Sequence, residues 1–267
     1  MKKKKKIESK RILSKKKPEK KLLLSLKERA GRSSSGRITI RHRGSGVKKL
    51  YRIVDFGQKK INIPAKVLAL EYDPNRTAFL MLLQYDNGDK RYRIAPNGIK
   101  EGDSIICSEQ AEIKLGNRTK LENIPVGTEV YNIEIIPGRG GQIVRSAGVA
   151  AKVAAKEGKY CHLEMPSKEV RKVPVTCFAS IGQVSHPEKR FEKIRNAGSN
   201  RRKGWRPATR GSAMNPRDHP HGGGEGKAPI GLPHPKTPWG RPALGVKTRR
   251  RKSTNKYIVK RRQERKK

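Results

Sequence analysis

The middle of the chain alternates apolar and polar residues with the period of β-strands. The runs bounded by turn residues predict strands at residues 38–40, 51–56, 66–72, 78–85, 91–94 and 104–107. Asn87-Gly88, between two of these runs, is typical of a hairpin turn, because both residue types tolerate positive φ. Five or six short strands at regular spacing predict a small barrel of the oligonucleotide/oligosaccharide-binding (OB) type.

A second β pattern begins near Pro125. Its apolar runs predict strands at residues 130–136, 160–165 and 170–177. Residues 149–156 are ambiguous, because their repeated Val-Ala-Ala-Lys sequence favours a helix by propensity. We predict a strand there, since Gly158 then supplies the turn into the next strand and a small barrel needs that strand.

The pattern changes again near residue 187. Pro187 suits the first turn of a short helix at residues 187–197, with Phe191 and Ile194 on one face and Gly198 at its end. Beyond Gly198 neither the strand period nor the helix period appears, and residues 199–267 hold 9 Gly and 8 Pro. This segment is therefore expected to run as an extended tail without a core of its own, disordered alone and ordered on its partner.

Charge identifies the class of partner. The 267 residues include 65 Lys and Arg against 23 Asp and Glu, a formal net charge of +42. Residues 1–30 hold 14 basic and 3 acidic residues, and residues 199–267 hold 21 and 3. Such a charge requires a polyanion, either nucleic acid or an anionic membrane. The longest N-terminal apolar run, Leu22–Leu24, is too short for a signal-peptide core or a membrane span, which favours nucleic acid.

The three cysteines indicate a reducing compartment. Cys107, Cys161 and Cys177 are widely spaced, odd in number and form no Cys-x-x-Cys pair. We therefore expect buried free thiols, with no zinc site and no disulfide framework. In the tail, Trp205 and Trp239 could stack on exposed bases while Arg and Lys side chains meet phosphates.

These patterns divide the chain into four predicted parts. They are a basic N-terminal extension (residues 1–35), an OB-type RNA-binding domain (36–120), a second small β-barrel (121–198) and an RNA-threading tail (199–267).

Long motifs carry a family resemblance. Residues 215–226, Asn-Pro-Arg-Asp-His-Pro-His-Gly-Gly-Gly-Glu-Gly, resemble the signature segment of the universal large-subunit ribosomal protein L2 family, in its bacterial or organellar form. Other segments resemble the same family in the same order, at residues 36–39, 51–56, 71–76, 123–127, 137–142, 145–148, 237–240 and 256–259. The resemblance covers roughly residues 36–262.

The resemblance implies a fold and a role. It implies a mainly β chain with an N-terminal OB-fold barrel, then an SH3-like barrel, and extended basic tails. It implies a primary rRNA-binding structural constituent of the large subunit that stabilises rRNA near the peptidyl-transferase centre and supports subunit association and tRNA binding. Implied partners are large-subunit rRNA, neighbouring ribosomal proteins and the small subunit through an intersubunit bridge. We expect no membrane, no stable homo-oligomer and no cofactor beyond Mg²⁺ held mainly by rRNA, in a cytoplasmic or, alternatively, an organellar ribosome.

The predicted RNA-binding residues are mostly basic, with two tryptophans and the histidines and glycines of the signature. They are Arg41, Arg43, Lys48, Arg52, Arg145, Arg201, Arg202, Lys203, Trp205, Arg206, Arg210, Asn215, Arg217, His219, His221, Gly222, Gly223, Gly224, Trp239, Arg249, Arg250, Arg251 and Lys256.

Two other function classes compete with an RNA scaffold. The first is an enzyme with His219 as general base in peptidyl transfer. Its Pro and Gly flanks provide no rigid support, so we expect no catalytic residue, and we expect His219 and His221 to pack against RNA. The second is a general DNA or chromatin binder. A protein that binds through charge alone would not need the site-specific shape that two small barrels provide.

Three ligand motifs fail. His219 and His221 form a His-x-His pair, but no third metal ligand is evident, so we predict no metal site. A Walker loop ending at Gly226-Lys227 fails because His221 and Ala228 replace its first glycine and its hydroxyl. A dinucleotide fingerprint at Gly138-Arg139-Gly140 also fails, because its third glycine is replaced by isoleucine.

Overall fold

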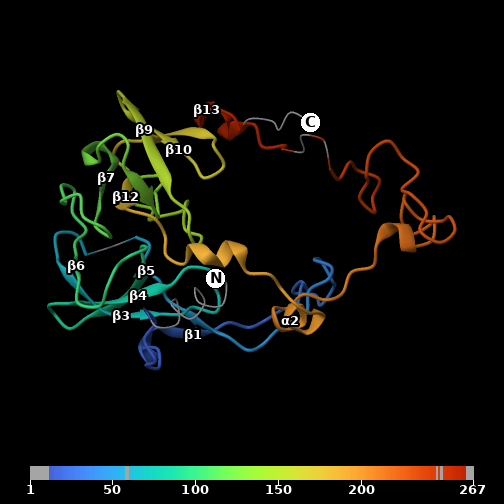
Figure 1. The fold of residues 1–267 in the computed structure, drawn as a ribbon, viewed down its shortest axis with the longest axis horizontal. Helices are drawn as coiled ribbons and strands as arrows, with labels where there is room; N and C mark the ends of the chain where they lie inside the picture. Colours follow the sequence, from blue (N-terminus) through green and yellow to red (C-terminus); the bar gives the residue numbers. More distant parts are fainter. Residues whose placement is uncertain (1–11, 58–59, 245, 247–248, 263–267) are drawn as a thin grey trace. The chain divides into compact units, whose positions relative to one another are not determined.

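A computed structural model describes residues 12–57, 60–244, 246 and 249–262. The first eleven residues of the predicted N-terminal extension lie outside this range. The described residues form two compact units. Unit 1 comprises residues 12–26, 49–193 and 254–262, and unit 2 comprises residues 27–48 and the described part of 194–253 (Figure 1).

The first curled sheet of unit 1 has four antiparallel strands in the order β5-β4-β3-β6 (Figure 1). They are β3 (Ala65–Glu71), β4 (Leu80–Tyr85), β5 (Lys90–Ile94) and β6 (Ser104–Ile105). Strand β4 is buried on both faces, because alternate side chains enter different hydrophobic clusters. Leu80 and Leu82 enter one cluster, and Met81 and Leu83 enter the other.

The predicted turn at Asn87-Gly88 joins β4 to β5. Gly88 takes a φ of 77°, and its N–H donates to the Tyr85 carbonyl at 2.9 Å. Asn87 does not enter the positive-φ region. The turn is therefore confirmed, with one left-handed residue rather than two.

The second sheet of unit 1 has seven strands in the order β13-β11-β10-β9-β8-β12-β7. They are β7 (Arg118–Lys120), β8 (Glu129–Tyr131), β9 (Ala151–Glu157), β10 (Tyr160–Glu164), β11 (Val170–Pro174), β12 (Phe178–Ile181) and β13 (Ile258–Lys260). Strand β9 confirms the choice of a strand for the ambiguous Val-Ala-Ala-Lys segment. Ala151 and Val153 are buried while Lys152 is exposed, so burial with period 2 outweighs helix propensity.

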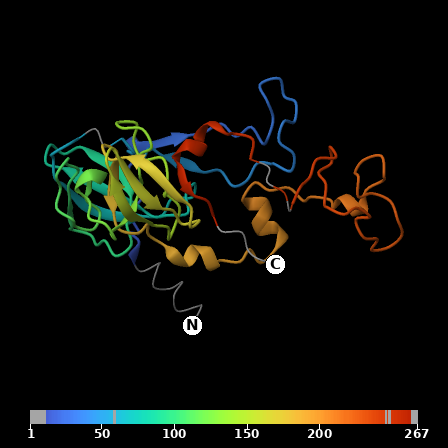
Figure 2. The same ribbon diagram turned by 90° about the horizontal axis from the view of Figure 1, so that it is seen from above.

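Both sheets contribute to one hydrophobic cluster. Leu82 and Tyr92 from the first sheet belong to the same cluster as Val130 and Leu163 from the second. The chain is mainly β, and its curled sheets form half-barrels consistent with the expected OB-type barrel followed by an SH3-like barrel (Figure 2).

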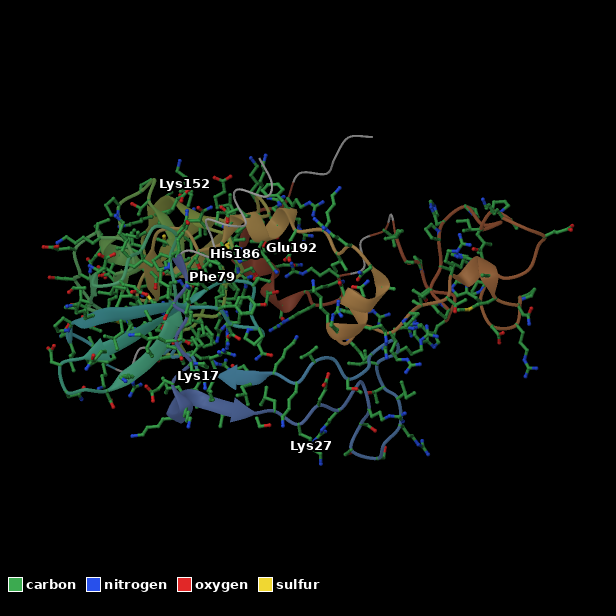
Figure 3. The ribbon with its side chains drawn as sticks, turned by 60° about the horizontal axis from the view of Figure 1, so that its bottom comes forward. Lys17, Lys27, Phe79, Lys152, His186 and Glu192 are labelled. Carbon is green, nitrogen blue, oxygen red and sulfur yellow. The ribbon has the colours of Figure 1, made fainter. Side chains whose placement is uncertain are left out.

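A stacked pair of rings joins the two parts of unit 1. Phe79, just before β4, stacks on His186, beyond β12, with ring centroids 4.4 Å apart (Figure 3). The adjacent Ser185 hydroxyl accepts the Phe79 N–H at 3.1 Å. These contacts fix the place where the chain leaves the second sheet.

The strand predicted at residues 38–40 is wrong. Ile38 makes an isolated bridge with Arg32, and Ile38 and Ile40 are exposed within unit 2. The strand predicted at residues 51–56 reduces to β2 (Leu50–Arg52), which pairs with the unpredicted β1 (Leu23–Ser25). Short apolar runs indicate strands only where a partner strand is available.

Other strands end earlier than predicted for local reasons. Strand β8 stops at Tyr131 because Asn132 takes a left-handed φ of 49°. Strand β11 ends at Pro174, a residue without an N–H to continue the ladder. The predicted strand at 104–107 contracts to β6.

Strands β7 and β12 were missed because polar residues interrupt their apolar pattern. Arg118, Thr119 and Ser180 are all buried there. Strand β13 was also missed, because it lies in the tail that was expected to lack regular structure, and it pairs with β11.

The helix predicted at residues 187–197 is wrong in type and extent. A 3₁₀ turn, η3, spans Pro187–Phe191, and Phe191 is 77% exposed, so no buried helix face forms. A separate helix, α2 (Ala197–Arg202), follows. Asn196 caps it by accepting the Ser199 N–H at 2.9 Å, so Gly198 lies in its first turn rather than ending a helix.

Candidate nucleic-acid interface

The predicted binding residues fall mostly on unit 2 and are mostly exposed. The exposed cationic ones are Arg41, Arg43, Lys48, Arg201, Arg202, Lys203, Arg206, Arg210, Arg217, Arg249, Arg250 and Arg251. Arg52, Arg145 and Lys256 lie on unit 1, and Arg52 is half-buried. Unit 2 has 22 Lys and Arg residues in its sequence against 3 Asp and Glu.

Two distant segments pair to form the base of unit 2. The Gly44 N–H donates to the Gly204 carbonyl at 2.9 Å, and the Val47 N–H donates to the Arg202 carbonyl at 3.0 Å. A Cβ at Gly46 would lie 2.6 Å from the Arg202 oxygen, so the approach requires glycine there. Residues 42–47 and 202–206 therefore form a paired strip, which we call the glycine ladder.

The glycine ladder was not predicted. The sequence pattern placed residues 42–47 in the first barrel and residues 202–206 in the tail. The signal available was the glycine content of both segments, since closely spaced glycines permit backbones to approach.

Each tryptophan of unit 2 carries an arginine on its ring. The Arg43 guanidinium carbon lies 3.8 Å from the Trp205 ring centroid. The Arg41 guanidinium carbon lies 5.0 Å from the Trp239 ring centroid. Both distances are within the range of cation–π attraction. Between these arginines, the His42 carbonyl accepts the Arg206 N–H at 3.0 Å, which anchors the arginine-bearing segment to the ladder.

The signature segment folds as a compact loop around His219. The His219 carbonyl accepts the Gly222 N–H at 2.8 Å, and the Met214 carbonyl accepts the Gly223 N–H at 3.1 Å. His219 is 7% exposed, and a Cβ at Gly211 would lie 2.5 Å from its ring. The expectation that the Pro and Gly flanks leave His219 without rigid support is therefore wrong, because the loop packs around its ring.

The two histidines accept backbone hydrogen bonds in sequence. The His221 N–H donates to Nδ1 of His219 at 3.0 Å, and the Lys236 N–H donates to Nε2 of His221 at 2.8 Å. Each ring nitrogen named here is the acceptor of a backbone N–H, so the two bonds fix the orientation of both rings. We call His219, His221 and Lys236 the histidine chain.

The histidine chain leads to a turn that presents Trp239. The Gly240 N–H donates to the Thr237 carbonyl at 2.9 Å, and the Thr237 N–H donates to the Arg241 carbonyl at 2.7 Å. Lys236 pairs with Pro242 across the base of this turn. Trp239 at the tip is 73% exposed.

Unit 1 holds a second glycine-rich segment against a buried ion pair. The Glu134 carboxylate receives an N–H from Gly138 at 3.2 Å and one from Gly140 at 3.1 Å. Arg118 donates to the same carboxylate at 3.0 Å, with both side chains almost fully buried. Beside this loop, the Arg145 guanidinium carbon lies 4.5 Å from the Phe56 ring centroid, so Arg145 is held at the surface by an aromatic contact.

The structure also bears on the cysteines, on metal binding and on membrane spans. Cys107, Cys161 and Cys177 are buried and free, as expected of packed thiols. Burial raises the pKa of the Cys161 thiol to about 11 and that of Cys177 to about 12. Within the described residues no cluster of three or more His, Cys, Asp or Glu side chains is placed to hold a metal ion. In that same part of the chain, no helix has the length and apolar character needed to cross a bilayer.

Comparison with known families accounts for most of the chain. Residues 19–107 match the model of the RNA-binding N-terminal domain of ribosomal proteins L2. Residues 114–240 match the model of the C-terminal domain of the same proteins, and this match includes the His219 loop and the Trp239 turn. Since the two matches follow one another and together span well over half of the sequence, the chain belongs to the ribosomal protein L2 family.

Proposed function

We propose that the chain is a primary rRNA-binding protein of the large ribosomal subunit and that unit 2 is its main RNA-binding surface. Membership of the L2 family gives the chain a structural role in the large subunit and an RNA-binding domain. The observation that supports the finer assignment is the concentration of exposed cations on unit 2, where acidic residues are few. Arginine and lysine side chains supply most protein contacts to phosphates.

The family also motivates the position within the ribosome. We propose that residues 199–267 thread into rRNA near the peptidyl-transferase centre and that the chain supports subunit association and tRNA binding. Neighbouring ribosomal proteins and the small subunit are its proposed protein partners, in a cytoplasmic ribosome or, alternatively, an organellar one.

Peptide-bond formation is proposed not to use His219 as a base. Its Nδ1 already accepts the His221 N–H, and its side chain is only 7% exposed, which leaves little access for a substrate. A general base needs a free acceptor nitrogen directed at its substrate. If the His219→Gln variant assembles into subunits normally but peptide-bond formation on them collapses, this part of the proposal is wrong.

Salt dependence tests the role of unit 2. The test variant replaces three exposed unit 2 arginines by glutamine, and the control removes three exposed unit 1 charges. The test substitutions are Arg201→Gln, Arg202→Gln and Arg206→Gln, and the control substitutions are Lys152→Gln, Lys159→Gln and Lys168→Gln. Each lost phosphate contact lowers the slope of log affinity against log salt by roughly 0.7–0.9.

The expected result is a slope reduced by about 2 units in the test variant and little changed in the control. Equal slopes in the two variants would contradict the proposal that unit 2 is the main RNA-binding surface.

Retention on large subunits through a high-salt wash tests whether the chain is a large-subunit rRNA-binding protein, and complete release of the unmodified chain would contradict that assignment. Competition by duplex DNA as effective as that by rRNA would favour a general nucleic-acid binder.

A further inference from the structure

We propose that Trp205 and Trp239 are two stacking platforms for unpaired RNA bases, and that the histidine chain positions the second platform. This inference rests on the proposed function of unit 2 and assigns a base-recognition site to it. It concerns bases rather than phosphates, so it can fail while the proposed function stands.

The Trp205 platform is built across the glycine ladder. Arg43 and Trp205 form an antiparallel bridge, which brings the guanidinium over the indole at 3.8 Å. Trp205 remains 46% exposed although arginine occupies one face of its ring. A base stacked on the free face would complete an arginine–indole–base sandwich, in which the cation also draws in the phosphates that flank the base.

The Trp239 platform is built on the turn at Thr237–Gly240. The indole is at the tip of a hydrogen-bonded turn, with Arg41 at 5.0 Å from its centroid. The ring is 73% exposed, so most of its apolar surface is open to a ligand. Arg41 and Arg43 are separated by one residue, so both platforms take their cation from one short segment.

The histidine chain fixes where the turn begins. The His221 ring holds the Lys236 N–H, and the His221 N–H is held in turn by the buried ring of His219. Lys236 pairs across the base of the turn that carries Trp239. His219 and His221 are therefore positioning residues, which act on a base through Trp239 rather than by touching it.

The chemistry of the platforms favours unpaired RNA over other partners. Bases inside a duplex are already stacked on their neighbours and present no free face, whereas splayed bases do. An acidic peptide would use the arginines but would gain little from two exposed indole faces. Stacking on an aromatic side chain also tolerates any base, so the sites recognise exposure rather than sequence.

The chain has two tryptophans, so fluorescence can report on each platform separately. In Trp205→Phe the signal comes from Trp239, and in Trp239→Phe it comes from Trp205. Each variant of the full chain is titrated with three probes of equal length: a 12-nucleotide oligoadenylate, the corresponding abasic RNA strand and an RNA duplex. Anisotropy of end-labelled probes measures binding independently.

We expect oligoadenylate to quench both tryptophans strongly, and the abasic strand and the duplex to quench them weakly at the same saturation. Replacing either tryptophan by alanine is expected to weaken oligoadenylate binding roughly 5- to 100-fold. Binding of all three probes with equal quenching, or with none, overturns the inference and leaves the proposed function intact. If none of the three RNA probes binds, both this inference and the proposed function are overturned.

The positioning role needs its own comparison. In the Trp205→Phe background, His221→Ala is expected to reduce quenching of Trp239 by oligoadenylate. In the Trp239→Phe background, the same change is expected to leave Trp205 quenching unchanged. His234→Ala alters an exposed histidine of the same unit and serves as the control. If His221→Ala reduces the quenching of both Trp205 and Trp239, unit 2 as a whole is disrupted and the positioning role is overturned. The role is also overturned if His234→Ala reduces Trp239 quenching as much as His221→Ala does.

Discussion

The buried pair of Arg118 and Glu134 is expected to be essential to the second half-barrel. Their side chains are 1% and 2% exposed, and they approach to 3.0 Å. Burial lowers the pKa of Arg118, and the Glu134 charge opposes that shift. Glu134 also accepts the N–H groups of Gly138, Gly140 and Phe178. Every acceptor direction of this carboxylate is thus engaged.

The perturbation is Glu134→Gln, which removes the charge with little change of shape. It leaves Arg118 as a buried cation without a counter-charge and turns an amide NH₂ toward backbone donors. Breaking a buried pair in this way costs about 3–5 kcal/mol, a large part of the 5–15 kcal/mol typical of a domain. Glu122→Gln, at an exposed site, is the control and is expected to change stability by less than about 0.5 kcal/mol.

Replacing both charges is expected to remain costly. In many proteins an apolar pair can substitute for a buried ion pair at no loss. In Arg118→Met/Glu134→Leu, however, the N–H groups of Gly138, Gly140 and Phe178 lose their acceptor, and a buried donor such as that of Gly140 costs about 1–3 kcal/mol when unpaired. The double variant is therefore expected to be no more stable than the wild type.

Thiol labelling along a urea gradient measures these changes in the full chain, because all three cysteines are buried in unit 1. Amide exchange at Gly138 and Gly140 reports the local effect, and we expect their protection to fall in Glu134→Gln. A loss of under about 1 kcal/mol, close to that of the control, would refute the reasoning.

Three further outcomes are expected. Burial raises the pKa of Glu71, so its contribution to stability is present below its ordinary pKa of 4.5 and is lost as pH rises through the folded-state pKa. Over that rise in pH, Glu71→Gln should gain stability relative to wild type in urea titrations, and a constant difference would contradict this. The raised pKa values of Cys161 and Cys177 predict negligible labelling by a thiol reagent at pH 8 without denaturant, and rapid native-state labelling would contradict it. Gly46→Ala should clash with the Arg202 carbonyl and deprotect the Val47 amide. Gly198→Ala in α2 is its control, because the added Cβ would lie no nearer than 4.0 Å to the Asn196 side-chain oxygen, and it should be neutral or stabilising by up to about 1 kcal/mol.

The β elements of unit 1 were predictable where burial alternates along a strand with a partner beside it. The local pattern predicted β3, β4, β5 and β10. It predicted β9 only with the added argument that a small barrel needs a strand there, against the helix propensity of the segment. Strands β7 and β12 were not predictable in this way, because the buried Arg118 and Ser180 resemble surface residues in the sequence. A polar residue can be buried when its partners come from remote parts of the chain, and periodicity does not report those partners.

The candidate interface was predictable in composition and not in arrangement. Charge and the lack of apolar periodicity indicated which segments carry the exposed cations, and the two tryptophans were identified as stacking candidates. Their arginine partners were not paired with them, because Arg43 and Trp205 are brought together by backbone hydrogen bonds between segments far apart in sequence. The compact loop at His219 was also missed, because it is held by glycine contacts rather than by an apolar face.

The cluster shared by the two half-barrels has a consequence for synthesis of the chain. Leu82 and Tyr92 complete their packing against Val130 and Leu163, which leave the ribosome many residues later. The first sheet therefore emerges with one face uncovered and is completed only when the second sheet follows. A nascent chain paused after the first sheet and before the second would expose this apolar surface. Chaperone binding is therefore expected to matter most at that stage of synthesis.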